Sequence, residues 1–435
     1  MKLITHKGRS SLALINLLFI GSLMSNANAQ ECPQENLPDI STVAVPMHPD
    51  DAAQTSIDRL KYRGGIHLQH DDERFGAFSG SHITEDGSTL TAVGGGVWMR
   101  GELTYDESGD LSGFEIECFD SLGDEQGNSL SRQEDMDAEA LAFDGEEFLV
   151  GFETELRVWA YRDLSGPARD VSLPDYMPTA VPTGAGYSSL ASDSPGTFYL
   201  MTEGGRSGEN RWKGYFRQAT GSGRFWIQKY GRDPFLPVGL AVMPDGNLIL
   251  GEIATVTEGE TAAYRRLRIS TLYVAGLAHD SVLTPVPVAA LGPPLIGEKY
   301  ETIESHRGPN GETLIYIMSD DGFQDTEATM IRMYELLPAP TVPQDLPDQT
   351  RITLSPTGEI QVDGEFILII DGTDPEIQGN GLVSDGGRLT VENGVSVRTG
   401  SFIVESNGDA SFTPGSETSR TILMEDAVIA PAQQR

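Results

Sequence analysis

The chain has 435 residues, and its 65 acidic residues outweigh its 30 lysines and arginines, which gives a formal net charge of −35 at pH 7. A protein this acidic is a poor partner for nucleic acids and for anionic membranes, because both require a basic surface. Its charge is compatible with bound divalent cations, and equally with a saline habitat.

Residues 1–29 have the composition of a secretory signal. A positively charged start is followed by an apolar stretch, Leu12 to Met24, which is too short to span a bilayer comfortably. The small residues of Ala27-Asn28-Ala29 form a cleavage site. We therefore expect a secreted or periplasmic protein that begins near Gln30 and has no membrane span in its mature chain.

Two cysteines remain in the expected mature chain, Cys32 and Cys118. In an exported protein, a pair of cysteines favours one disulfide over two free thiols. We expect this bond to tie an N-terminal entry segment, residues 30–59, to the strands that follow.

A short unit recurs from residue 60 to residue 337. In its clearest copy, two apolar runs at 140–143 and 148–152 flank the turn dipeptide Asp144-Gly145, whose glycine can take a positive φ. Other copies carry Asp86-Gly87, Pro195-Gly196, Asp245-Gly246 and Asn310-Gly311 at the turn. The copies are separated by 60, 49, 50 and 63 residues when they are aligned on Gly80, Ala140, Ser189, Gly239 and Thr302.

Repeats of this length with several short strands each are typical of propeller blades. The sequence therefore predicts an all-β fold, a β-propeller of five or six blades over residues 60–337. Residues 338–350 form a Pro-rich linker. Residues 351–435 alternate short β runs with Gly and Asn turns, which predicts a small β domain or appendage.

Six motifs resemble, in their order, the secreted "esterase-like activity of phytase" family, also called phytase-like proteins. The resemblance covers about residues 60–337 and implies a β-propeller that hydrolyses phosphate or other esters. The motifs are Tyr62-Arg63-Gly64-Gly65, Phe75-Gly76-Ala77-Phe78-Ser79-Gly80, Asp137-Ala138-Glu139-Ala140-Leu141-Ala142, Phe152-Glu153 with Arg157-Val158-Trp159, Leu240-Ala241 with Pro244-Asp245-Gly246, and Ser319-Asp320-Asp321-Gly322-Phe323.

The resemblance also points to one acidic position in each repeat. That acid is kept at Glu139 and Glu301, whereas the aligned residues of two other repeats are Ser188 and Val238. Equivalent residues of different blades lie at similar depth around a propeller axis, so we expect the two glutamates on one face. Clustered carboxylates are hard oxygen ligands that suit Ca²⁺. The expected metal ligands are Glu139, Glu301, Asp137, Asp320 and Asp321.

Two groups of arginines stand out in a chain this acidic. Arg206 and Arg211 belong to one group, and Arg266 belongs to the other. Paired guanidinium N–H donors match the oxygens of a phosphate. We expect these three arginines to contact a small-molecule ester or phosphate substrate beside the metal, in a monomeric protein.

Other reaction classes find less support in the sequence. No G-x-S-x-G elbow occurs, and Ser81 and His82 are neighbours on a strand and would point to opposite faces. The histidines lack the spacing of a zinc hydrolase. Two alternatives stay open, a non-catalytic binding or scaffold propeller and a lactonase-type metal-dependent hydrolase. The acids themselves are alternatively solvated strand ends, or partners of arginines between blades.

Overall fold

The computed structural model describes residues 37–130, 137–154, 156–174, 177, 186–207, 211–228, 235–258, 262–323 and 328–338, together with the strands between residues 351 and 431. Only the backbone is described for residues 203–207, 256–258, 262–263 and 320, and for the strands beyond residue 350. The expected signal segment 1–29 and Cys32 lie outside the described residues, as does almost all of the expected linker.

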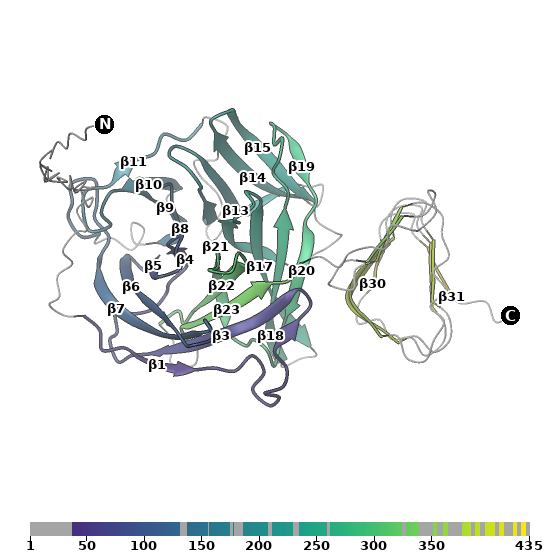
Figure 1. Ribbon diagram of the computed structural model, residues 1–435. Coiled ribbons are helices and arrows are strands. Elements are labelled where there is room, and N and C mark those ends of the chain that lie inside the picture. The colour runs from purple at the N-terminus through teal and green to yellow at the C-terminus, as the bar shows by residue number, and fades with distance from the viewer. Residues whose placement is uncertain are drawn as a thin grey trace, which may run out of the picture. The chain divides into compact units, whose positions relative to one another are not determined.

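Five antiparallel sheets follow one another around the ring in Figure 1. Each has four main strands. In the first four sheets, the strand that comes first in the chain is the innermost. In the last sheet, the outer strand comes from the N-terminal side of the propeller sequence, and the other three follow in chain order from the innermost outward. The first three sheets are β4 (Gly80–Ile83), β5 (Thr89–Gly94), β6 (Val97–Tyr105) and β7 (Leu111–Ser121); β8 (Ala138–Phe143), β9 (Phe148–Phe152), β10 (Arg157–Tyr161) and β11 (Arg169–Asp170); and β12 (Tyr187–Ala191), β13 (Phe198–Ser207), β14 (Arg211–Gln218) and β15 (Gly221–Gln228).

The fourth and fifth sheets complete the ring. In the fourth, β20 (Val286–Leu291) is the outer strand, and the short strand β19 (Ser281–Leu283) that precedes it pairs in parallel with β15 of the third sheet. The remaining sheets are β16 (Leu236–Val242), β17 (Leu248–Glu258), β18 (Ala262–Leu272) and β20 (Val286–Leu291); and β21 (Lys299–Arg307), β22 (Thr313–Asp320), β23 (Met330–Leu336) and β3 (Leu60–Gln69).

The inner strands β4, β8, β12, β16 and β21 contact one another in sequence, and β21 contacts β4. The circle is therefore closed, and the protein is a five-bladed β-propeller. This decides between the five and six blades that the repeat spacing allowed. Every anchor of the sequence alignment, from Gly80 to Thr302, lies on one of these inner strands.

The ring closes through β3, the strand that precedes the first complete blade. It pairs antiparallel with β23 at the outer edge of blade 5, and two short strands, β1 (Ser41–Ala44) and β2 (Ser56–Ile57), pair with it in turn. At Gly64, β3 also meets β7 of blade 1. A Cβ on Gly64 would lie 2.3 Å from the carbonyl oxygen of Leu111, so the approach of the two blades requires glycine there.

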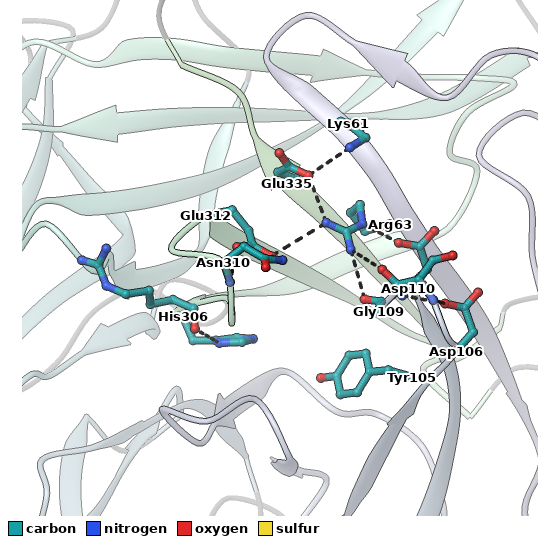
Figure 2. A network of polar contacts seen from close by, with 12 residues as sticks. Lys61, Arg63, Tyr105, Asp106, Gly109, Asp110, His306, Asn310, Glu312 and Glu335 are labelled. Carbon is teal, nitrogen blue, oxygen red and sulfur yellow. Dashed lines mark hydrogen bonds and ion pairs between the residues drawn. The ribbon is translucent and has the colours of Figure 1, made fainter.

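Arg63 also joins blades 1 and 5 along β3, at a boundary that we call the seam (Figure 2). Its guanidinium bonds the Asp110 carboxylate and the Gly109 carbonyl in blade 1, and it bonds Glu335 of blade 5 at 3.0 Å. The Arg63 side chain is only 12% exposed, so these charge-assisted bonds form in a partly desolvated place. One side chain from the closing strand therefore joins the first and last blades.

The apolar runs of the sequence become strands that are buried on both faces. All five residues of β12 are buried, because each blade is packed between two neighbours. The core is accordingly a set of clusters shared by adjacent blades, and one of them joins Met318 and Met333 of blade 5 to Met99 of blade 1 and to Phe75 in the segment before it.

The turns that join the first two strands of each blade form as the sequence predicted. Their glycines adopt positive φ angles between 73° and 96°. In the Asp-Gly turns the aspartate accepts backbone hydrogen bonds, as Asp144 does from Glu146 N and Glu147 N at 2.9 Å. The glycines are Gly87, Gly145, Gly196, Gly246 and Gly311.

Eight further strands lie beyond the propeller sequence. After the antiparallel pair β24 and β25, the pairings are parallel and join strands about twenty residues apart, such as β26 with β28 and β27 with β29. Parallel pairing of successive short strands in two sheets is the pattern of a β-solenoid. The strands are β24 (Arg351–Leu354), β25 (Ile360–Asp363), β26 (Glu376–Val383), β27 (Arg388–Val391), β28 (Ser396–Val404), β29 (Asp409–Phe412), β30 (Thr421–Leu423) and β31 (Val428–Pro431).

Asp58, in the turn between β2 and β3, makes the stability of the closing strand depend on pH. Burial raises the pKa of its carboxyl to about 6, against a hydrogen bond from Ala290 N that lowers it. The folded state thus favours the neutral carboxyl. The contribution of Asp58 to the free energy of unfolding is greatest below pH 4 and falls as pH rises toward 6.

We predict that Asp58→Asn stabilises the protein at pH 7 by about 1–3 kcal/mol, since each pKa unit corresponds to about 1.4 kcal/mol. Asparagine cannot ionise, can still accept the Ala290 bond and tolerates the positive φ of 50° at this position. Denaturant unfolding at pH 7 and pH 4 measures the effect, with the exposed Asp50→Asn as control. An equal gain at both pH values would contradict the account.

Candidate functional site at the mouth of the central channel

The acidic position of the sequence repeat coincides with a β-bulge on the inner strands. On β8 the pairing with β9 passes from Ala138 to Ala140, which leaves Glu139 as the extra residue. The same shift occurs on β21 at Glu301, on β12 at Ser188 and on β16 at Val238. At a β-bulge, the side chain of the extra residue does not follow the strand's regular alternation between its two faces. These residues consequently lie at equivalent places around the axis.

The central channel beneath the bulges is narrow. Residues from the inner strands line it, and its free volume is near 10 Å³, which is about the room that one water needs. Ser81 of β4 donates a hydrogen bond of 2.8 Å to Thr302 Oγ1 of β21 across the wall. The channel at this level therefore has no room for a substrate, and its end at the bulges is called the mouth here.

Three carboxylates converge at this mouth. Asp137 comes directly before β8, Glu139 is its bulge residue, and Glu153 directly follows the paired strand β9. A backbone hydrogen bond of 3.0 Å from Glu153 N to Asp137 O joins the two strand ends. One oxygen from each carboxylate lies within 4.8 Å of the others, which is an arrangement that can hold a metal ion.

The carboxylates of the mouth oppose one another's ionisation. Burial raises the pKa of Glu139 well above its ordinary value, and the charges of Glu301, Asp137 and Glu153 raise it further. Burial and the charge of Asp137 also raise the pKa of Glu153. Like charges that share a desolvated site disfavour the ionised form of each. A cation at the mouth would remove this penalty.

One cation of the chain itself is already there. The ammonium of Lys299, the first residue of β21, forms an ion pair with Glu301 Oε1. Its charge also offsets part of the rise in the pKa of Glu139 and of Glu153. Glu301 thus belongs to the same electrostatic cluster as Glu139, with an ion pair of its own.

Asp320 is the last residue of the second strand of blade 5, and Asp321 directly follows it. Asp321 accepts hydrogen bonds from Ala77 N, Phe323 N and Thr329 Oγ1, and it lies 3.5 Å from His70 Nε2. The bond from Ala77 N ties the loop that leads into β4 to blade 5, whereas the bonds from Phe323 and Thr329 stay within the connection between β22 and β23. The backbone of Asp320 pairs with Lys299, at the edge of the mouth.

The three arginines expected to bind substrate lie on the second or third strands of two other blades. Arg211 is on β14, the third strand of blade 3, where it donates to Gln228 Oε1 at 3.1 Å. Arg266 is on β18, the third strand of blade 4, and its guanidinium stacks on Tyr264. The backbone of Arg206 pairs with Trp212 in blade 3. The structure brings Asp137, Glu139 and Glu301 into one electrostatic cluster.

A family model described as "Phytase-like: Esterase-like activity of phytase" matches residues 73–323, which is more than half of the chain. The chain belongs to the phytase-like family. The match lies within the region that the motifs delimited, and it spans all the carboxylates of the mouth. None of the curated proteins matches this phytase-like chain.

Two solved structures show distant likenesses to the chain. Apo AztD from Citrobacter koseri is 11% identical, with 64% of this chain and 96% of that chain covered and a TM-score of 0.28. The Cps50 (Swd1) β-propeller domain from Myceliophteria thermophila is 10% identical, with 60% and 96% covered and a TM-score of 0.25. Likenesses of this degree carry no argument, so the five-bladed architecture rests on the strand pairing of the phytase-like chain itself.

Ser81 and His82 do not form a nucleophile and base pair. Ser81 faces the channel, whereas the His82 ring packs against Phe143 and Phe148, with centroids 5.5 and 6.2 Å apart. Burial lowers the pKa of His82 to about 4.

In the part of the chain that the structure describes, no helix has the length and apolar character needed to cross a membrane.

Sequence reasoning missed Lys299 and Glu304. Glu304 lines the channel on β21, and burial raises its pKa well above the ordinary value. Strand alternation places Glu304 on the same face as Thr302, which was a usable signal. No sequence signal identified Lys299, because its position relative to Glu301 depends on the bulge.

We predict that Glu139→Gln stabilises the metal-free phytase-like protein at pH 8 by on the order of 1 kcal/mol. A raised pKa means that ionisation of Glu139 opposes folding, so its contribution to stability falls as pH rises above the unfolded-state value. Thermal unfolding in excess chelator measures the effect.

The gain should shrink as pH falls through the ordinary glutamate pKa of 4.5 and vanish below it, because the wild-type carboxyl is then protonated in the unfolded state as well as in the folded state. Glu107→Gln, at an exposed turn of blade 1, serves as the control and should change little. A loss of stability in Glu139→Gln at pH 8 would show that the ionised carboxylate is favoured by its surroundings.

Proposed function

We propose that this phytase-like propeller is a hydrolase of phosphate or other esters that acts at the channel mouth with the help of a divalent cation, Ca²⁺ by preference. The observation that carries the proposal is the convergence of Asp137, Glu139 and Glu153 within 4.8 Å. Ca²⁺ takes six to eight oxygen ligands, so three carboxylates leave positions for water and for a substrate oxygen.

The residues present suit such a cation. All three donors are hard carboxylate oxygens, and their mutual repulsion favours an added positive charge. When bound, a divalent cation supplies Lewis-acid polarisation of a phosphoryl or carbonyl oxygen and lowers the pKa of a coordinated water. The chain positions the donors through the bulge at Glu139 and through the backbone bond between Asp137 and Glu153.

The binding or scaffold alternative has its own support. Ser188 and Val238 occupy two of the bulge positions, so the ring of acids at the mouth is incomplete. A propeller that binds a cation and an anionic ligand without hydrolysing it would need no more than this. Propellers host many unrelated functions, so the fold does not choose between the two.

We predict that Ca²⁺ raises the melting temperature of the wild type, since a ligand at a hundred times its dissociation constant adds about 2.7 kcal/mol to the free energy of unfolding. The double variant Glu139→Gln, Glu153→Gln should lose most of this rise, and Glu107→Gln should keep it. If Ca²⁺ stabilises the wild type and the double variant equally, these acids are not the site.

Activity is tested on the same proteins with p-nitrophenyl phosphate, p-nitrophenyl acetate and a δ-lactone, with and without chelator. We expect Ca²⁺-dependent hydrolysis of at least one compound and a loss of about a hundredfold or more in the double variant. Turnover of the lactone alone would favour the lactonase-type alternative. Binding of Ca²⁺ without turnover of any compound would favour the binding propeller.

We further propose that the protein is exported and that Cys118 pairs with Cys32. Cys118 lies on β7 and is buried, with Arg100 Nη2 at 3.2 Å from its sulfur. A bond to Cys32 would tie the N-terminal segment to blade 1.

A thiol assay on the denatured, unreduced mature protein should then find no titratable thiol. If the protein is exported, N-terminal sequencing of the mature protein should give a sequence that starts near Gln30. Reduction should destabilise the protein by about 2–4 kcal/mol. Two thiols per chain would exclude the pairing.

A further inference from the structure

Lys299 places a positive charge inside the acidic mouth. It is the first residue of β21, two residues before the bulge at Glu301, and its ammonium pairs with Glu301 Oε1. The Lys299 side chain is 45% exposed, whereas that of Glu301 is 6% exposed. The buried carboxylate is thus met from the solvent side by an ammonium on a flexible stem, which shows that this cluster already holds one cation.

The influence of Lys299 extends beyond its own ion pair. Its charge acts on Glu139 and on Glu153, which are two of the three carboxylates that converge at the mouth. Glu301 in turn acts on Glu139. The four carboxylates and the ammonium therefore form one coupled group with a net charge of −3 when all are ionised.

We propose that Lys299 is a tethered competitor of the divalent cation and sets the affinity of the mouth for it. The inference rests on the proposed cation site. A divalent ion among Asp137, Glu139 and Glu153 would meet repulsion from the nearby ammonium, and the energy of that repulsion depends on their separation and on the local dielectric. Lys299 therefore holds the affinity below the value that the carboxylates alone would give.

The geometry lets the competitor move aside without unfolding. The backbone of Lys299 is fixed by its pairing with Asp320 of β22, while the ammonium ends a stem of four methylene groups with many rotamers. A bound divalent ion would push the ammonium toward solvent. The mouth thus has a built-in counter-charge that keeps its acids compatible with folding when no metal is present.

The test is calorimetric titration of Ca²⁺ into metal-free wild type, Lys299→Met and Lys299→Arg at one ionic strength. We expect Lys299→Met to bind Ca²⁺ about tenfold more tightly, because it removes the opposing charge and keeps much of the stem. Lys299→Arg keeps the charge and should bind within about threefold of the wild type. Lys299→Gln is the second neutral variant, in case the methionine protein does not fold.

Two further variants separate the effect of Lys299 from the total charge of the mouth. Glu301→Gln removes the partner of the ammonium and should weaken Ca²⁺ binding. The double variant Lys299→Met, Glu301→Gln has the wild-type net charge at the mouth and should bind more tightly than Glu301→Gln alone. If the double variant binds no better than Glu301→Gln, Lys299 is not a competitor.

The outcomes distinguish this inference from the proposed function. Equal or weaker binding by the neutral Lys299 variants overturns the inference and leaves a Ca²⁺-assisted hydrolase standing. Binding by Lys299→Met with none by the wild type supports the inference and overturns Ca²⁺ assistance in the native protein. Absence of binding in every protein overturns both.

Discussion

The structure depends on the closure of its ring by a strand from the other end of the domain. β3 enters blade 5 beside β23, and Arg63 on that strand bonds carboxylates of blade 5 and blade 1 together (Figure 2). Without this seam the last blade would present an unpaired edge. Because all five inner strands face one axis only in the closed ring, the seam also determines the geometry of the distant channel mouth.

The mouth is built from a β-bulge that recurs on the inner strands of blades 2 to 5. A bulge near the start of an inner strand turns one side chain out of the sheet, and the ring brings these side chains to equivalent places. Blades 2 and 5 place a glutamate there, whereas blades 3 and 4 place a serine and a valine. The same backbone thus supports an asymmetric site, with its acids on one side of the axis and Lys299 beside them.

The charges at this site are partly compensated within the chain. Carboxylates gathered in a desolvated place oppose ionisation, and the raised pKa of Glu139 expresses that opposition. The ion pair between Lys299 and Glu301 offsets part of it. A mouth of this kind suits a second, exchangeable cation, which is the physical basis of the proposed metal-assisted hydrolysis.

The sequence by itself determined the all-β class, the positions of the inner strands and the turns at Gly87, Gly145, Gly196, Gly246 and Gly311, because apolar runs and turn glycines are local signals. It also singled out Glu139 and Glu301, since equivalent positions of a repeat are visible as an alignment. Only the tertiary structure decided that there are five blades, because the fifth takes its outer strand from residues before the first repeat. The tertiary structure alone also brought the charge of Lys299 to bear on Glu139 and placed Arg211 and Arg266 on the third strands of their blades, because such positions depend on strand pairing and bulges and not on spacing along the chain.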